Sequence, residues 1–256
     1  MKNSRYILLI YFLLTAMSGY GQEIEIRQLS AFDKIIVSPL IDLILIPGET
    51  ESVRLEVINT EIDKVNSKVN GHTLRIFLDD ARIVAKRKRR IKRRKRHDDP
   101  SVLFERSIYR DVTVKAYVTY KSLRNLQVRG DARITSQGKL ETDKFKLKLF
   151  GDNRANFEYL KTNCLKVVLY GDNIVKIEGG KATKQVYKSY GDNRFDALNM
   201  PGEYVRSHLY GENELTLNID ERIRISSMGV ADIFVKGRPK LRKGIVFGDI
   251  DIRRIR

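Results

Sequence analysis

Carboxylates recur along the second half of the sequence at intervals of 20 or 21 residues, each directly after a glycine. They are Asp131, Asp152, Asp172, Asp192 and Glu212. If the chain forms stacked coils, neighbouring carboxylates lie about one strand spacing apart, about 4.8 Å. Two carboxylates at that distance can share a Ca²⁺ ion. Paired carboxylates on such a surface are also the catalytic groups of a glycosidase or a lyase.

A simpler interpretation is that these aspartates shape a turn, because Asp side chains bond to the backbone of their own turn. A catalytic site is expected to be a local exception to a repeat, whereas these residues are the repeat. We therefore assign no catalytic residue and predict no cofactor. Asp131, Asp152, Asp172 and Asp192 remain candidate calcium ligands.

An aromatic residue precedes the glycine in successive repeats, at Phe150, Tyr170, Tyr190 and Tyr210. Alternation along a strand predicts that these rings point outward. A row of exposed rings is a platform on which sugar rings can stack. Alternatively, the rings pack over the turn or hold adjacent strands in register.

One tract is strongly basic. The chain of 256 residues has a formal net charge of +17, and ten of its 49 lysines and arginines lie within residues 86–96. They are Lys86, Arg87, Lys88, Arg89, Arg90, Lys92, Arg93, Arg94, Lys95 and Arg96. Such a run binds an anionic glycan, a lipid head group or nucleic acid, or it is a solvated loop. The run lacks interleaved aromatic residues, which argues against nucleic acid.

Other chemistry finds little support in the sequence. Cys164 is the single cysteine, so intramolecular disulfides and Cys-based zinc clusters are excluded. His72, His97 and His208 are scattered and suggest no metal site. We find no phosphate-binding glycine loop, nucleophile elbow or dinucleotide fingerprint.

Residues 1–21 have the three parts of a secretory signal peptide. Lys2 and Arg5 precede a short apolar run over residues 7–14, and small residues follow. The apolar run is shorter than the roughly 20 residues that span a bilayer, and no later segment looks transmembrane. We predict an exported protein of the periplasm, the outer-membrane surface or the extracellular space.

The repeat itself predicts the fold. Glycines lie 18 to 21 residues apart at Gly130, Gly151, Gly171, Gly191, Gly211, Gly229 and Gly248. Asparagines follow at a constant interval of 20, at Asn153, Asn173, Asn193 and Asn213. A period near 20 is typical of a solenoid. Glycine permits a positive φ at each turn, and stacked Asn side chains can form a hydrogen-bonded ladder.

Period-two alternation on both sides of each turn indicates half-buried strands. Ala155 with Phe157 in one repeat is exchanged for Phe195 with Ala197 in another, as expected if both positions point into a packed interior. The repeat is too short for a βαβ unit or a propeller blade. We predict an all-β, right-handed parallel β-helix with coils of about 20 residues.

The N-terminal third also reads as strands, with turn signals at Pro47-Gly48 and Asn70-Gly71. These strands form either the first coils or a cap on the solenoid. We predict a single domain over residues 22–256. Its parts are N-terminal strands or a cap (22–80), a basic insertion (81–108) and repeat coils (109–256).

Several segments resemble a known family. Residues 32–35 and 42–48, and the stretch from Val112 to Gly130-Asp131, resemble the head GIN domain of bacterial auto-transporter adhesins. The Gly-Asp-Asn corners replace the Gly-Ser-Gly-like corners that are typical of the family, so the sequence resembles a divergent member. The resemblance implies an exported β-helical protein of Bacteroidetes-like bacteria and carries over no catalytic residue.

Together these observations favour a non-enzymatic interaction protein of the cell surface or periplasm. The expected partner is an anionic polysaccharide or another cell-surface component, bound by the basic run and the aromatic row. Two alternatives stay open: a carbohydrate-active enzyme resembling a polysaccharide lyase, and a purely structural scaffold.

Overall fold

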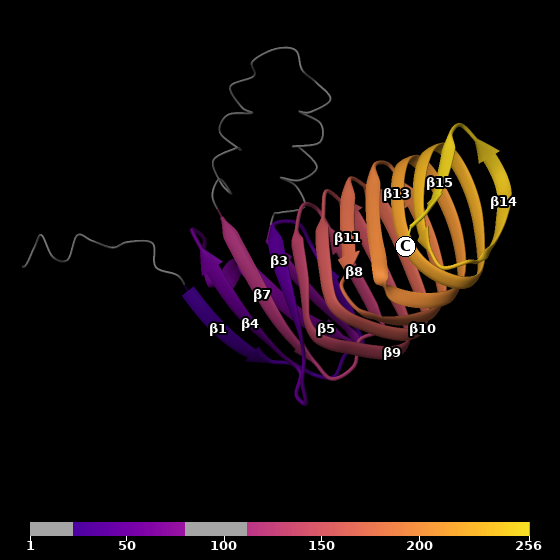
Figure 1. Cartoon of the computed structure of the whole chain (residues 1–256). Helices are drawn as coiled ribbons and strands as arrows, with labels where there is room; N and C mark the ends of the chain where they lie inside the picture. The colour runs from indigo at the N-terminus through magenta and orange to yellow at the C-terminus, as the bar shows by residue number, and fades with distance from the viewer. Residues whose placement is uncertain (1–22, 80–111, 256) are drawn as a thin grey trace, which may run out of the picture.

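The chain winds into a β-solenoid of about six coils, which stack along one axis from the N-terminal to the C-terminal end (Figure 1). The structure is a computed structural model and describes residues 23–79 and 112–255. The predicted signal peptide at residues 1–21 and the basic run at residues 86–96 lie outside the described residues. The predicted β-solenoid is confirmed, since strands make up 79% of the structure and form about six stacked coils.

The N-terminal strands are short. They are β1 (Glu23–Gln28), β2 (Lys34–Val37), β3 (Ile41–Pro47), β4 (Ser52–Ile58), β5 (Val65–Asn70), β6 (Thr73–Leu78), β7 (Thr113–Tyr120) and β8 (Asn125–Arg129). A single 3-10 turn, η1 (Ile62–Lys64), connects β4 to β5.

The later strands are longer and several bend around corners of the coil. They are β9 (Arg133–Gly151), β10 (Arg154–Gly171), β11 (Asn173–Ile177), β12 (Gly180–Tyr190), β13 (Asn193–Lys236), β14 (Lys240–Phe247) and β15 (Ile250–Arg254). Two residues of the same column are about 20 positions apart, as in the parallel pairing of Leu165 with Phe145 and with Gln185.

Two walls enclose the core. The first wall runs through β1, β4, β7 and β3 and continues through parts of β9, β10, β11 and β13 to β15. The second wall runs through β5, β6, β2 and β8 and continues through parts of β9, β10, β12 and β13 to β14. Alternate side chains of both walls point inward and form one hydrophobic cluster.

The size exchange read from the sequence is confirmed. Ala155, Phe157, Phe195 and Ala197 are all buried. The Phe157 ring meets Phe145 edge to face at 5.9 Å between ring centroids. A large and a small residue thus trade places between coils, which keeps the interior filled.

The N-terminal coils do not follow chain order. β2 lies between β6 and β8, and β3 lies between β7 and β9. The first segment of the chain is therefore inserted between two later ones. Antiparallel pairs, β1 with β4, β4 with β7, and β5 with β6, form this end of the molecule. A capping role for these strands stays a prediction.

The glycine corner explains why coils can stack so closely. Gly171 has φ +103°, and a Cβ built on it would lie 2.4 Å from the carbonyl oxygen of Gly151. Gly151, Gly191 and Gly211 repeat both features. Only glycine accepts the positive φ and leaves room for the neighbouring carbonyl.

Replacement of Gly171 by alanine tests this constraint. An alanine in a left-handed conformation costs about 1–2 kcal/mol. We expect Gly171→Ala to lower the free energy of unfolding by clearly more than this, because its methyl group also clashes with the backbone of the neighbouring coil. Gly71→Ala is the matched control, since Gly71 has φ +57° and nothing within 4 Å of a built Cβ. Equal losses in the two variants, measured by chemical denaturation, would contradict the stacking argument.

Candidate functional site

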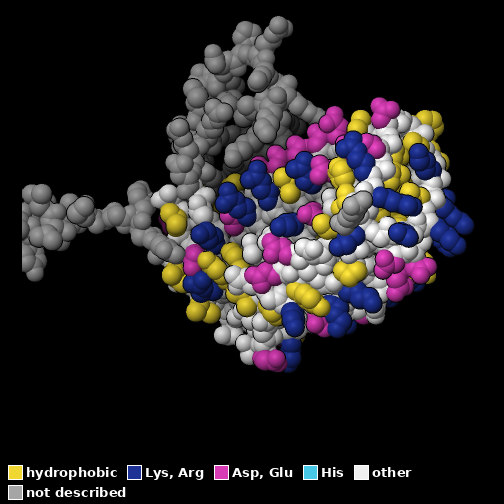
Figure 2. All heavy atoms as spheres, viewed as in Figure 1, with side chains coloured by type: hydrophobic (Ala, Val, Ile, Leu, Met, Phe, Trp, Pro, Cys, Tyr) yellow, Lys and Arg dark blue, Asp and Glu magenta, His cyan; other side chains and the backbone are white. Residues whose placement is uncertain are grey.

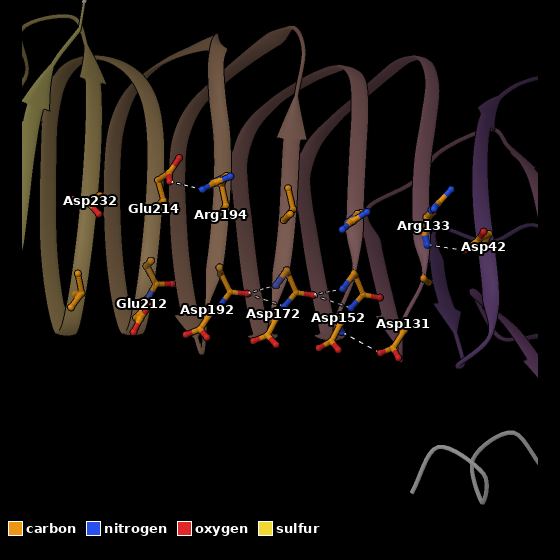
Figure 3. Close-up of a pocket in the computed structure, with 18 residues that line it drawn as sticks. Asp42, Asp131, Arg133, Asp152, Asp172, Asp192, Arg194, Glu212, Glu214 and Asp232 are labelled. Atoms are coloured by element: carbon orange, nitrogen blue, oxygen red, sulfur yellow. Dashed lines mark hydrogen bonds and ion pairs between the residues drawn. The ribbon is translucent and has the colours of Figure 1, made fainter. Parts of the chain in front are cut away.

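The Gly-Asp-Asn corner separates two sets of polar side chains. In Figure 3 the carboxylates of Asp131, Asp152, Asp172, Asp192 and Glu212 form a row that points away from the interior. The asparagines that follow them turn the other way and are buried, with Asn153 and Asn173 fully so. The corner thus presents carboxylates to solvent and amides to the core.

The buried amides form a ladder between coils. Nδ2 of Asn153 donates to Oδ1 of Asn173 at 2.9 Å, and Nδ2 of Asn173 donates to Oδ1 of Asn193 at 2.8 Å. The backbone N–H groups of Asn153 and Asn173 donate to the same two oxygens. Each internal amide therefore satisfies a side chain and a turn N–H of the preceding coil.

The ladder has two ends. Ala132 occupies the position before Asn153, and Oδ1 of Asn153 has no hydrogen-bond partner. At the other end, Oδ1 of Asn213 accepts from the Ser189 hydroxyl, and Nδ2 of Asn193 is left without a partner. The sequence placed Asn213 in the ladder, and its side chain is instead engaged by Ser189.

The acidic row borders an open groove of about 790 Å³ that follows the corner. Arg133, Arg154 and Arg194 line it as well, and Arg194 pairs with Glu214 at 2.9 Å. Within residues 23–79 and 112–255, no group of three or more His, Cys, Asp or Glu is arranged to hold a metal ion. The candidate calcium ligands therefore lie in a row without forming such a cluster.

The aromatic row forms a continuous stack. Ring centroids lie 5.1 Å apart from Phe150 to Tyr170, 4.6 Å from Tyr170 to Tyr190 and 4.9 Å from Tyr190 to Tyr210. The planes are within 5° of parallel. The Arg129 guanidinium lies 5.7 Å from the Phe150 centroid and ends the stack with a cation. We call these four rings the aromatic column.

The column is exposed along its edge, with Tyr170 and Tyr210 each 39% exposed. The stacked rings cover each other's faces, so their edges and hydroxyl groups are what a ligand meets. Burial, together with the neighbouring Tyr170 and Tyr210, raises the pKa of Tyr190. Tyr190 consequently offers a neutral hydroxyl group that both donates and accepts hydrogen bonds.

Beside the column, the outward side of the second wall is basic. It consists of stretches 144–150, 164–170, 184–190, 204–210, 222–228 and 240–247, none of which contains Asp or Glu. Their outward positions carry eleven lysines and arginines: Lys144, Lys146, Lys148, Lys166, Lys184, Lys188, Arg206, Arg222, Arg224, Lys240 and Arg242. We call this surface the basic wall.

The mutual repulsion of these cations contributes, after burial, to the lowered pKa values of two side chains. Partial burial and the nearby charges of Lys188, Arg206 and Arg224 lower the pKa of His208. Burial, followed by the charges of Lys148 and Lys34, lowers the pKa of Lys146. Positive charge is therefore concentrated here without compensation from carboxylates on the same stretches.

The first wall differs in its charge pattern. Its outward cations alternate with carboxylates, and Lys176 lies 3.6 Å from Glu178. Asn156 also donates to Glu178. Figure 2 shows such an interspersed face, with both signs of charge mixed and a run of acidic side chains along one edge.

Sequence reasoning missed the basic wall, although a signal for it was present. Lys144, Lys146 and Lys148 alternate with buried residues, and cations recur in the same phase one and two repeats later. The run at residues 86–96, which lies outside the described residues, holds ten cations and masks this weaker periodic signal in the sequence. Cys164 also lies on this wall, half-buried between Lys144 and Lys184.

Comparison with known proteins now decides the family. A family model described as "Putative auto-transporter adhesin, head GIN domain" matches residues 31–239. The chain belongs to this family.

Solved structures share the fold of this head GIN domain at low sequence identity. A putative adhesin from Bacteroides fragilis has a TM-score of 0.67 and 18% identity, over 92% of this chain and 97% of that one. A putative adhesin from Parabacteroides merdae has a TM-score of 0.65 and 14% identity, over 93% and 98%.

A third similar structure carries a different name. It is a putative lipid binding protein from Parabacteroides distasonis, with a TM-score of 0.60 and 12% identity, over 93% of this chain and 98% of that one. No curated protein matches the chain. Among the described residues, no helix is long and apolar enough to cross a membrane.

If the asparagine ladder stabilises the corner, the loss of stability on replacing an asparagine should depend on its position in the ladder. Asn173→Ala should lower the free energy of unfolding by about 2–4 kcal/mol, because it removes an acceptor from two N–H groups of Asn153 and a donor to Asn193. Asn213→Ala should cost less, since it removes a single side-chain bond to Ser189. The reverse order, measured by chemical denaturation, would show that the ladder does not hold the corner.

Proposed function

We propose that this adhesin-family domain is an exported, non-enzymatic interaction protein that binds an anionic polysaccharide of a cell surface. The basic wall supplies charge attraction, and the aromatic column along its edge supplies contacts for sugar rings. The observation that carries the proposal is the acid-free set of outward cations, which continues over six stretches of the second wall.

Electrostatics favours an extended partner over a small one. Cations in adjacent coils lie about one strand spacing apart, so the wall offers charge along the whole axis of the solenoid. A surface of one sign attracts oppositely charged polymers and weakens as salt screens it. The basic run at residues 86–96 adds ten further cations, and we propose that it contacts the same polymer.

The aromatic column adds selectivity for carbohydrate. Tyrosine presents an apolar ring edge and a hydroxyl group, a combination that suits the mixed apolar and polar faces of sugars. Tyr170 and Tyr210 are the most exposed rings of the column. A polymer without rings, such as inorganic polyphosphate, gains only from the charges.

Removal of wall cations should weaken binding. Lys188→Gln with Arg206→Gln should reduce affinity for dextran sulfate about 20- to 30-fold at low salt, because each cation near an anionic surface contributes about 1 kcal/mol. The control is Arg154→Gln with Lys176→Gln, which removes the same charge from the first wall. Affinities are measured by titration calorimetry. Two further titrations serve as comparisons: the unmodified protein with neutral dextran, and a variant lacking residues 86–96 with dextran sulfate.

Three results of that experiment would count against the proposal. If the basic-wall variant and the control variant lose equal affinity for dextran sulfate, binding depends only on the overall positive charge and not on the basic wall. Binding of neutral dextran as tight as dextran sulfate would remove the role of charge. Binding that depends on residues 86–96 alone would transfer the site to the basic run.

The column can be tested separately from the wall. Tyr210→Ala should weaken binding to dextran sulfate by roughly tenfold and leave binding to polyphosphate unchanged, whereas Tyr210→Phe should retain most of the apolar contact. A parallel loss for both polymers would show that the ring change acts through the structure of the wall.

Because His208 lies on the basic wall, we expect the affinity for a polyanion to depend on pH. Its lowered pKa keeps the imidazole mostly neutral at pH 7, and a bound polyanion favours the charged form. Affinity for a sulfated polymer should therefore rise about fivefold from pH 7 to pH 5, the effect of one added cation. His208→Gln should remove that rise; an unchanged pH profile would exclude His208 from the contact surface.

A second candidate function follows from the acidic groove. Carboxylates of Asp152 and Asp172 lie in an open groove together with Arg154, an arrangement compatible with a lyase or glycosidase acting on an acidic polysaccharide. Incubation with polygalacturonate or chondroitin sulfate, followed by assay of unsaturated and reducing ends, tests it. Product formation that is lost in Asp152→Asn would establish the enzyme.

A further inference from the structure

The two ends of the solenoid differ in what covers the core. At the N-terminal end, Val53, Leu55 and Val57 of β4 are fully buried. Arg27 of β1 spans from one wall to the other, donating to the Val65 carbonyl at 2.6 Å, and pairs with Glu25. The interior is therefore closed at this end.

The C-terminal end is open. Leu241 stacks on the inward column of Ile223 but is 41% exposed, because no further coil follows among the described residues. Phe247 of the same strand pairs with the outward Met228 and adds 62% exposure to the apolar surface beside this end. Solenoids bury their core by stacking, so an end coil with this much apolar exposure calls for a covering element.

Both ends also present free strand edges. In the described chain β14 and β15 pair only with β13, while β1 pairs only with β4. Such edges carry unpaired N–H and C=O groups that a further strand can bond. Asp249 and Ile255, the residues on either side of β15, donate their N–H groups to the preceding coil. By alternation, the N–H of Arg254 therefore faces the free edge.

The direction of the edges is compatible with continuation. β1 is antiparallel to β4, β4 is antiparallel to β7, and β7 is parallel to β3 and hence to the rest of the first wall. β1 therefore runs in the same direction as β15. A second molecule placed end to end would extend the first wall with one more parallel pair.

The charges of the two ends are complementary. Residues 237–255 at the C-terminal end hold six basic and two acidic side chains. β1 and residues 61–64 at the N-terminal end hold four acidic and two basic side chains, and Glu23 contacts this turn through the Ile62 N–H at 3.1 Å. Ile24 and Ile26 add apolar exposure there, at 56% and 64%. Two C-terminal ends would repel each other.

We propose that the chain associates head to tail with a second copy of itself, with β15 and the open C-terminal coil of one molecule seated on β1 of the next. This interface is heterologous, so it continues into a linear array unless one end is blocked. The proposal does not rest on polysaccharide binding, since it uses the strand edges of the two ends. Of the basic wall, only Lys240 and Arg242 also belong to the C-terminal end.

Blocking each end in turn gives the test. Proline removes an edge-facing N–H and is tolerated on edge strands. Arg254→Pro blocks the C-terminal edge. Ile26→Pro blocks the N-terminal edge, because the bond from Leu29 N–H to the Glu51 carbonyl places the N–H of Ile26 on the free side by alternation. Arg254→Ala and Ile26→Ala keep the N–H groups and serve as controls.

Sedimentation of the chain from residue 22 onward is measured from micromolar to millimolar concentration. The unmodified chain should associate with concentration, and less so at high salt. Each proline variant alone should stay monomeric, and an equimolar mixture should form a dimer and stop there. Unchanged circular dichroism confirms that both variants are folded.

Other outcomes overturn the proposal. A chain that is monomeric at every concentration excludes the array. Dimers of Ile26→Pro alone would indicate pairing of two C-terminal ends. Failure of the two folded proline variants to combine in the mixture would show that the free edges do not meet.

Discussion

The close approach of successive coils at the glycine corner is the constraint on which the rest of the structure depends. The N–H of Asp172 donates to the Gly151 carbonyl at 3.1 Å, and that of Asp192 donates to the Gly171 carbonyl at the same distance. A side chain on these glycines would fill the space that the neighbouring carbonyl occupies. Because one corner is fixed in every coil, residues 20 positions apart fall into straight columns, which become the amide ladder, the ring stack and the rows of charge.

The columns separate charges of opposite sign. Carboxylates point outward at the corner, the aromatic column follows, and the cations of the basic wall lie beyond it. Like charges one strand spacing apart repel each other. Burial lowers the pKa of His208, and the charges of Lys188, Arg206 and Arg224 lower it further. A wall that keeps its cations despite this cost is suited to a polyanionic partner, which would relieve the repulsion on binding.

Much of this could be predicted from the sequence, because a 20-residue repeat aligns its own columns. The alternation of Phe145, Leu147 and Leu149 predicted strands, and the size exchange between Phe157 and Phe195 predicted an inward pair. Chain order could not predict that β2 lies between β6 and β8, since parallel pairing over long separations leaves no local signal. Asn213 leaves the ladder for a similar reason, because Ser189, 24 residues earlier, captures its oxygen.

Lysine footprinting tests the central claim, that the basic wall is the binding surface, most directly. The protein is acetylated at low reagent concentration with and without dextran sulfate, and each lysine is quantified by mass spectrometry. The account predicts protection of Lys148, Lys166 and Lys188, while Lys161 and Lys176, which lie outside the basic wall, react equally in both samples. Uniform protection of all five lysines, or protection confined to Lys161 and Lys176, would contradict it.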